Sequence, residues 1–213
     1  MTYTNDEQPV RNPVRVLVFG ASLRSGSLNQ CLASAAAEAV EREGGIADLE
    51  EMSAFDAPSY DGDLESELGI PPGAEEFGRR LAEADGFVIA SPEYNGSMPG
   101  PLKNLIDWGS RFDPQPFAGK HGLLLSASPS PYGGHLGLWS LRVPFEVLGV
   151  RLHPEMFSVP KGQEAFDEEG RLADPGQRHR LQDMVRSFLD GMEADKHYVP
   201  EVRDRASTAS MQS

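Results

Sequence analysis

In the middle of the chain the sequence reads Ser91-Pro92-Glu93-Tyr94-Asn95-Gly96-Ser97-Met98-Pro99-Gly100-Pro101-Leu102-Lys103-Asn104. This segment follows the short apolar run 86–90, which is typical of a buried parallel strand, and it leads into apolar residues at helical spacing. Prolines fix the path of the loop, and Asn95-Gly96 tolerates positive φ angles. Ligands of open α/β sheets bind at the carboxyl ends of strands. The segment is therefore either a ligand-binding loop or an ordinary turn between a strand and a helix.

A second loop of the same kind lies near the N-terminus and reads Gly20-Ala21-Ser22-Leu23-Arg24-Ser25-Gly26-Ser27. It joins the apolar run 15–19 to an alanine-rich helical pattern, for which Ser27 is the expected N-cap. Free amides at a helix N-terminus attract anions, and the serines and Arg24 add further donors. The loop matches neither the P-loop, nor Gly-x-Gly-x-x-Gly, nor the hydrolase elbow. It indicates a cradle for a monophosphate, with a serine-rich helix cap as the alternative.

Strands and helices alternate along the sequence. Strands are expected at 15–19, 46–52, 86–90, 122–126 and 150–159. Helices are expected between them and after the last strand, at 174–192, and a third loop of Ser, Pro and Gly spans 126–134. This alternation predicts a doubly wound parallel sheet of five strands in three α/β/α layers, in a flavodoxin-like order. In that order the loops after the first and third strands meet at the point where ligands bind.

Composition restricts the possible partners. The chain has 213 residues, enough for one domain, and a formal net charge of −14, which disfavours nucleic acid and anionic membranes. No apolar run reaches the roughly 20 residues that span a bilayer, and the N-terminus does not resemble a signal peptide. The expected location is therefore cytoplasmic. The single cysteine, Cys31, excludes an internal disulfide and fits a small buried helix residue better than a nucleophile.

The two loops together resemble the NADPH-dependent FMN reductase family, which includes flavodoxin-like chromate, azo-dye and quinone reductases. The similarity extends over about residues 14–152, and two motifs in the correct order are much more specific than either alone. The resemblance implies a flavodoxin-like fold, bound FMN, NADPH or NADH as co-substrate, and a homodimer or homotetramer with the flavin near a subunit interface.

The resemblance also implies which residues bind the cofactor. In the first loop it places Ser22, Arg24, Ser27, Leu28 and Asn29 at the FMN phosphate. The second loop would line the isoalloxazine ring, mostly through backbone groups, with Pro92, Glu93, Tyr94, Asn95 and Gly96. The third loop would contribute Ser126, Ser128, Gly133 and Gly134, although Pro129 and Pro131 make it stiffer than is typical.

The expected reaction requires no catalytic acid, base or nucleophile from the protein. FMN takes hydride from NAD(P)H and passes electrons to a small acceptor such as free flavin, a quinone, an azo compound or a metal oxyanion. His121, His135 and His153 show no metal-ligand spacing, so no metal site is expected. Two alternatives stay open: an electron carrier without nicotinamide turnover, and a non-flavin protein whose cradle binds another phosphate.

Three segments lie outside these motifs. Residues 1–13 form a polar extension, with the reductase domain expected at 14–194. The acidic segment 56–73 is either an excursion near the site or a surface loop without a role. The polar segment 195–213 is expected to be extended or disordered, or to reach a neighbouring subunit.

Overall fold

The computed structural model of the chain describes the backbone of residues 13–210 and the side chains of residues 13–196. All strand pairings in its sheet are parallel, and the strand order is β2-β1-β3-β4-β5, with β6 also paired to β4. The strands are β1 (Arg15–Gly20), β2 (Ile46–Glu51), β3 (Gly86–Ala90), β4 (His121–Ala127), β5 (Arg151–Leu152) and β6 (Phe157–Val159). This is the flavodoxin-like order predicted from the sequence.

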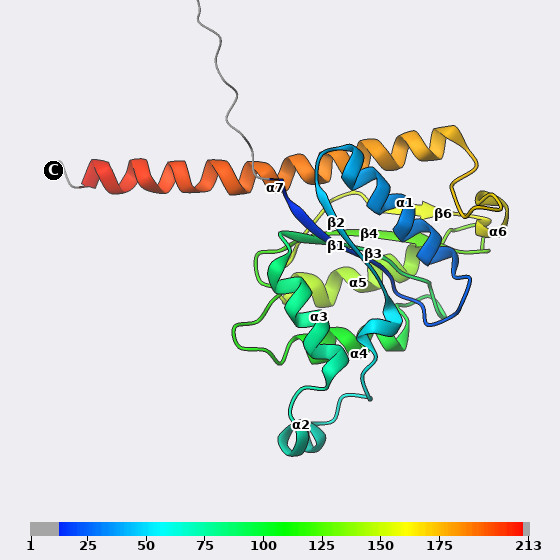
Figure 1. The fold of residues 1–213 in the computed structure, drawn as a ribbon, viewed down its shortest axis with the longest axis horizontal. Coiled ribbons are helices and arrows are strands. Elements are labelled where there is room, and N and C mark those ends of the chain that lie inside the picture. The colour runs from blue at the N-terminus through cyan, green and yellow to red at the C-terminus, as the bar shows by residue number, and fades with distance from the viewer. Residues whose placement is uncertain (1–12, 211–213) are drawn as a thin grey trace, which may run out of the picture.

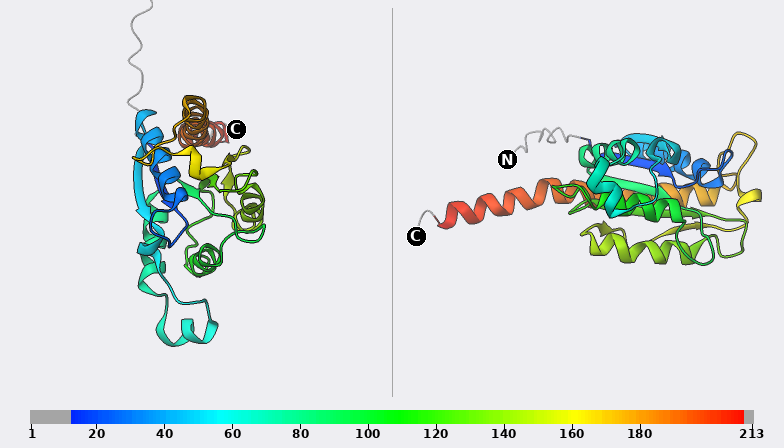
Figure 2. Two further views of the ribbon diagram at one scale, coloured as in Figure 1. Left: turned by 90° about the vertical axis from the view of Figure 1, so that its right-hand side faces the viewer. Right: turned by 90° about the horizontal axis from the view of Figure 1, so that it is seen from below.

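Helices cover both faces of the sheet (Figure 1). The helices are α1 (Leu28–Arg42), α2 (Gly62–Leu68), α3 (Pro72–Glu83), α4 (Gly100–Gly109), α5 (His135–Val147), α6 (Gly162–Ala165) and α7 (Pro175–Ser210), with a short 3-10 helix, η1, at Met52–Phe55. Helices α1 and α7 cover one face, and α3, α4 and α5 cover the other (Figure 2). The three-layer α/β/α architecture is therefore confirmed.

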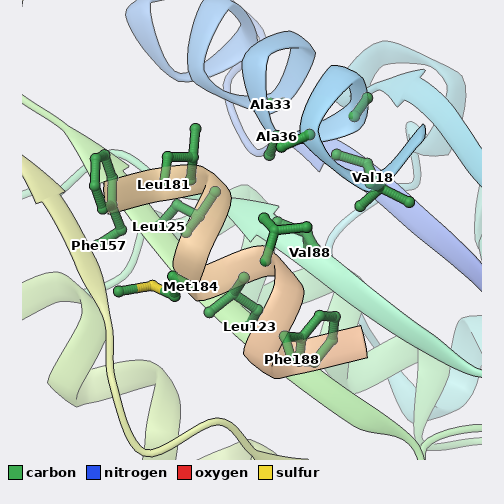
Figure 3. Close-up of a cluster of buried hydrophobic side chains, with 14 of the residues drawn as sticks. Val18, Ala33, Ala36, Val88, Leu123, Leu125, Phe157, Leu181, Met184 and Phe188 are labelled. Atoms are coloured by element: carbon green, nitrogen blue, oxygen red, sulfur yellow. The ribbon is translucent and has the colours of Figure 1, made fainter. Parts of the chain in front are cut away.

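Alternation along the central strands divides the core into two clusters. In β1, Val16 and Val18 face α1 and α7, whereas Leu17 and Phe19 face α3, α4 and α5. A strand buried on both faces must be apolar at every position, which is why these runs can be recognised in the sequence. Figure 3 shows the first cluster, in which Phe188 and other residues of α7 lie over β3 and β4 beside the small residues of α1.

The last strand differs from the expectation in being split. β5 pairs with the start of β4, and β6 pairs with its end. Between them, residues 153–156 leave the ladder at Pro154, which cannot donate a backbone hydrogen bond. One expected strand thus becomes two short ones, at opposite ends of β4.

The acidic segment 56–73 is not simply a loop, because it contains α2, whose N-cap Asp61 accepts a hydrogen bond from the Asp63 amide. The stretch before α2 is held against α4: Asn104 Nδ2 and Trp108 Nε1 both donate to the Pro58 carbonyl, at 2.9 and 2.8 Å. Helix α2 itself lies at the end of an excursion from the domain (Figure 1).

The expectation of an extended or disordered C-terminal segment is wrong for its backbone up to residue 210. Helix α7 continues to Ser210 and extends well beyond the sheet (Figures 1 and 2). The apolar face that packs on the sheet ends at Met192, which is why the pattern predicted a helix end there. The expected extension at 1–13 lies outside the described residues, except for residue 13. Within the described part of the chain, no helix is long and apolar enough to cross a membrane.

Candidate functional site

Three loops leave the same end of the sheet. Gly20 pairs with Ala90, and Ala90 pairs with Leu125, so the loops after β1 and β3 begin side by side, while β4 continues to Ala127 before its loop begins. Hydrogen bonds continue one step beyond this level, from Ala21 N to Ala90 O and from Ser91 N to Leu125 O, both at 2.8 Å. The loops enclose a pocket of about 220 Å³, lined by Ser22, Arg24, Ser27, Leu28, Asn29, Pro92, Glu93, Tyr94, Ala127, Ser128 and Pro129. Nine of the fourteen residues named from the sequence line it.

The first loop carries several unpaired donors, and two of the residues that carry them, Arg24 and Leu28, line this pocket. Ser27 is the N-cap of α1, and its Oγ accepts a hydrogen bond from the Asn29 amide at 3.2 Å. Among the described residues, the backbone N–H groups of Ser25, Gly26 and Leu28 have no acceptor. The exposed Arg24 guanidinium likewise forms no ion pair within the described part of the chain. Amides at a helix N-terminus beside a free guanidinium are a suitable donor set for a phosphate.

Asn29 connects the first loop to the third. Its Nδ2 donates to the Ala127 carbonyl at 3.0 Å, and its Oδ1 accepts from the Ala127 amide at 2.9 Å. Asn29 is 4% exposed, and a primary amide has two N–H donors. Only one of them is therefore left for a ligand, and the main task of the side chain is to hold two walls of the pocket together.

The second loop contains a tight two-residue turn. Tyr94 N donates to Ser97 O at 2.9 Å, and Ser97 N donates to Tyr94 O at 3.1 Å. Between them Asn95 and Gly96 have φ angles of 52° and 73°, so the expected tolerance of positive φ is used here. Tyr94 lines the pocket and is 52% exposed, whereas Asn95 and Gly96 form the tip of the turn away from the pocket wall.

In the third loop the structure separates the four named residues. Ser128 lines the pocket. Ser126 is fully buried, and its Oγ has no hydrogen-bond partner in the described region. It lies beneath Gly134, where an added Cβ would sit 2.0 Å from Ser126 Oγ. A Cβ on Gly133 would lie 2.9 Å from the Val159 carbonyl carbon at the end of β6, so Ser126, Gly133 and Gly134 support the loop from behind.

Sequence reasoning missed two residues of the pocket wall, Ala127 and Pro129. They flank Ser128, but neither has the polar side chain or the glycine backbone that indicates a ligand contact in a sequence. The end of the buried apolar run of β4 was the signal that could have located the first residue of the pocket wall. Ser126 continues the buried run of that strand, and the chain reaches the pocket only from Ala127 onward.

The histidines lie away from the pocket. His121 begins β4 at the opposite end of the sheet, with its Nε2 2.9 Å from Asp195 Oδ2, and burial lowers its pKa. Burial also lowers the pKa of His153. His135 accepts a hydrogen bond from Trp139 Nε1 at 2.8 Å. In the described part of the chain, no three His, Cys, Asp or Glu side chains are grouped as metal ligands would be. Cys31 is half-buried on α1, beside Gly170.

Comparisons with known proteins agree with this geometry. The family model described as NADPH-dependent FMN reductase matches residues 14–164. An NAD(P)H-dependent FMN reductase of Pseudomonas aeruginosa is 37% identical over 176 residues, covering 82% of this chain and 93% of the relative. A probable NADPH:quinone oxidoreductase of Oryza sativa subsp. japonica is 36% identical over 178 residues, covering 82% and 87%.

A solved structure is similar over most of its length. FerB of Paracoccus denitrificans, described as a flavoenzyme NAD(P)H:(acceptor) oxidoreductase, superimposes with a TM-score of 0.72 at 28% identity, covering 84% of this chain and 97% of FerB. The two loop motifs, the sheet order and these matches agree, and the chain belongs to the NADPH-dependent FMN reductase family.

Proposed function

We infer that this chain is an oxidoreductase that binds FMN in the pocket formed by the three loops, takes hydride from NAD(P)H and transfers electrons to a small acceptor. The observation that carries this inference is the donor set of the first loop. The amides of Ser25, Gly26 and Leu28 lie at the N-terminus of α1, next to the Arg24 guanidinium, and none of these groups has a partner among the described residues. This set is suited to a phosphate monoester, and it lies next to a wall that contains an exposed tyrosine.

Each loop has a separate task in this proposal. The amides of the first loop and Arg24 hold the phosphate, and Asn29 keeps the third loop closed against them. Tyr94 and the backbone around Pro92 border the ring. Bound FMN supplies hydride acceptance and electron transfer, so the protein needs to provide only position and electrostatic environment. The wall of the pocket that contains the exposed Tyr94 leaves space for a nicotinamide, and then an acceptor, to approach the ring.

We propose that the acceptor is a small oxidised molecule such as a quinone or a free flavin. Relatives named as quinone oxidoreductases and FMN reductases support this acceptor class. We also propose that the enzyme acts in the cytoplasm, where reduced nicotinamide is available.

We propose further that the protein forms a homodimer or homotetramer. Helix α5 supports this proposal, because its outer face is apolar. Leu136, Trp139, Val143 and Val147 recur at helical spacing and are 58%, 54%, 67% and 81% exposed. Exposure of this row of apolar side chains to water is unfavourable. The row lies on the helix that directly follows the third loop. A second copy packed there would place a subunit boundary close to the flavin pocket.

Steady-state kinetics test the proposed reaction. The purified protein, loaded with FMN, is mixed with NADPH or NADH and a soluble benzoquinone, and nicotinamide absorbance is followed. We expect multiple turnovers that depend on both FMN and the quinone. An FMN-loaded protein that oxidises neither nicotinamide would instead be an electron carrier.

A further inference from the structure

Both ends of the second loop are attached to one part of helix α5. At the start of the loop, Glu93 Oε2 accepts a hydrogen bond from the Gly137 amide at 2.9 Å. At its end, the Met98 amide donates to Ser140 Oγ at 2.8 Å, and this hydroxyl donates to the Gly137 carbonyl at 2.7 Å. One residue of α5, Gly137, is thus bonded at its N–H to one end of the loop and, through Ser140, at its carbonyl to the other.

The tip of the loop has no other attachment of this kind. Between Glu93 and Met98, all hydrogen bonds in the described structure that reach another element go to Gly137 or Ser140. The remaining two join Tyr94 and Ser97 to each other. These two bonds, together with the packing of Met98 against the core, therefore hold the turn relative to the pocket.

Close packing accompanies the attachment. A Cβ on Gly137 would lie 3.1 Å from the Glu93 Cβ and 3.2 Å from its Cα, so a larger residue there would require the loop to shift by a few tenths of an ångström. A Cβ on Gly134 would be 3.6 Å from the same Glu93 Cβ. Glu93 therefore lies against two glycines at the start of α5, with the closer approach at Gly137.

The charge of Glu93 is also accounted for. Helix α5 has Gly134 as its N-cap, so no side chain caps it from within the helix. The Glu93 carboxylate takes that place, where the free amides and the helix dipole favour a negative charge. The carboxylate is thus directed to the helix.

We propose that Glu93 and Ser140 are positioning residues for the flavin: together they hold both ends of the 93–98 loop on α5 and so set the backbone that borders the isoalloxazine ring. This inference rests on the proposed FMN site. It adds a task for the Glu93 carboxylate to the expectation that the backbone of this loop lines the ring, because the carboxylate binds the helix and so holds the loop.

The test uses two truncations, Glu93→Ala and Ser140→Ala, and two conservative variants that keep a hydrogen-bonding oxygen, Glu93→Gln and Ser140→Thr. FMN and riboflavin affinities are measured by quenching of flavin fluorescence. Because riboflavin has the ring without the phosphate, a displaced ring loop should weaken both ligands by the same factor. We expect a loss of about tenfold for each truncation, and about threefold or less for each conservative variant.

A second measurement requires no flavin. Amide hydrogen exchange in the flavin-free protein should become faster at residues 94–98 in both truncations, while exchange in β1 and β3 stays as in the wild type. Such a local change would separate the loss of the attachment from a general loss of stability.

The outcomes distinguish this inference from the function on which it rests. Equal losses for both flavins, with faster exchange in the loop and recovery in the conservative variants, support it. Wild-type affinities in both truncations, or a loss confined to FMN, overturn it while the FMN site stands. A wild-type protein that binds neither flavin overturns the proposed function, and this inference with it.

Discussion

Asn29 and Ala127 are joined by two hydrogen bonds across 98 residues of sequence, one in each direction between the side-chain amide and the backbone. Both residues are buried, so removal of the amide leaves a peptide N–H and a carbonyl without partners. We expect Asn29→Ala to lower the free energy of unfolding by about 2–4 kcal/mol, measured by urea denaturation.

A matched control for this variant is Ser34→Ala on the same helix. Among the described residues, Ser34 Oγ bonds to the Gln30 carbonyl one turn earlier and to no other group, and this contact contributes little to helix stability. Its effect should be below about 0.5 kcal/mol. If Asn29→Ala were equally mild, the two loops would not depend on this connection.

The phosphate site predicts a charge-specific effect at Arg24. We expect Arg24→Ala to weaken FMN binding by about 1.5–3 kcal/mol, the usual contribution of a hydrogen bond to a charged group. Riboflavin affinity should not change, because riboflavin lacks the phosphate. Arg42→Ala removes the same charge at the far end of α1, where Arg42 pairs with Glu38, and should leave both affinities unchanged. An equal loss of FMN affinity in the two arginine variants would show that the effect comes from the net charge of the protein and not from a contact between Arg24 and the phosphate.

The first turn of α1 lies close to the end of β1. A Cβ on Gly20 would be 2.7 Å from the backbone N and Cα of Gln30, which cannot move without shifting the helix. We expect Gly20→Ala to cost about 1–3 kcal/mol of stability and to weaken FMN binding as well. Calorimetry and FMN titration of the same sample would measure both.

Gly191→Ala is the control for that substitution. Gly191 lies in α7, and an added Cβ would meet no atom within 4 Å. An alanine should therefore stabilise the helix, by about 0.5–1 kcal/mol. Unchanged stability and FMN affinity in Gly20→Ala would contradict the close approach of α1 to β1.

Glu43 makes stability depend on pH at the contact between α1 and α7. Its carboxylate accepts hydrogen bonds from Arg186 Nε at 2.8 Å and from Gln182 Nε2 at 2.6 Å, and these bonds lower the pKa of Glu43. A lowered folded-state pKa means that this contribution is complete above the ordinary pKa of 4.5 and is lost as pH falls through the lower folded value.

Glu43→Gln should therefore remove part of the acid dependence. We expect wild-type stability to fall more steeply than that of the variant as the pH drops below the ordinary glutamate pKa of 4.5, and the two slopes to agree near neutral pH. Parallel curves across the acid range would show that the ion pair does not contribute.

The outer face of α5 predicts an effect on assembly. Val143 is 67% exposed, so Val143→Glu should leave the fold of a subunit intact. In a homo-oligomer that uses this face, it would place unpaired carboxylates in an apolar contact, and we expect dissociation to monomers by sedimentation velocity. A wild-type protein that is already monomeric would contradict the proposed assembly.

The parts of the fold that the sequence could predict are those fixed by local chemistry. β1, β3 and β4 are apolar at successive positions because both of their faces are buried. Ser27 could be named as a cap because few residue types satisfy the amides of a helix start. The Asp61 cap and the acidic residues after it are also the usual signs of a helix start, and they could have predicted α2. The prolines and glycines around them favoured a loop instead.

Other features depend on contacts between distant segments. The bond between Glu93 and Gly137 joins residues 44 apart, and no spacing rule indicates it. Ser126 has the chemistry of a ligand contact, yet its place in β4 buries it beneath Gly134. The residue types of the three loops could therefore predict that a pocket exists. Which loop residues line it depends on tertiary packing, which the sequence does not display.

Titration of flavin-free protein with FMN and with riboflavin tests the central claim most directly, namely that the first loop holds a phosphate beside the ring-binding loops. We predict that one FMN binds per chain and that its affinity exceeds that of riboflavin by about 100-fold or more, because riboflavin forfeits several charge-assisted hydrogen bonds. Equal affinities for the two flavins, or a folded protein that binds neither, would contradict it.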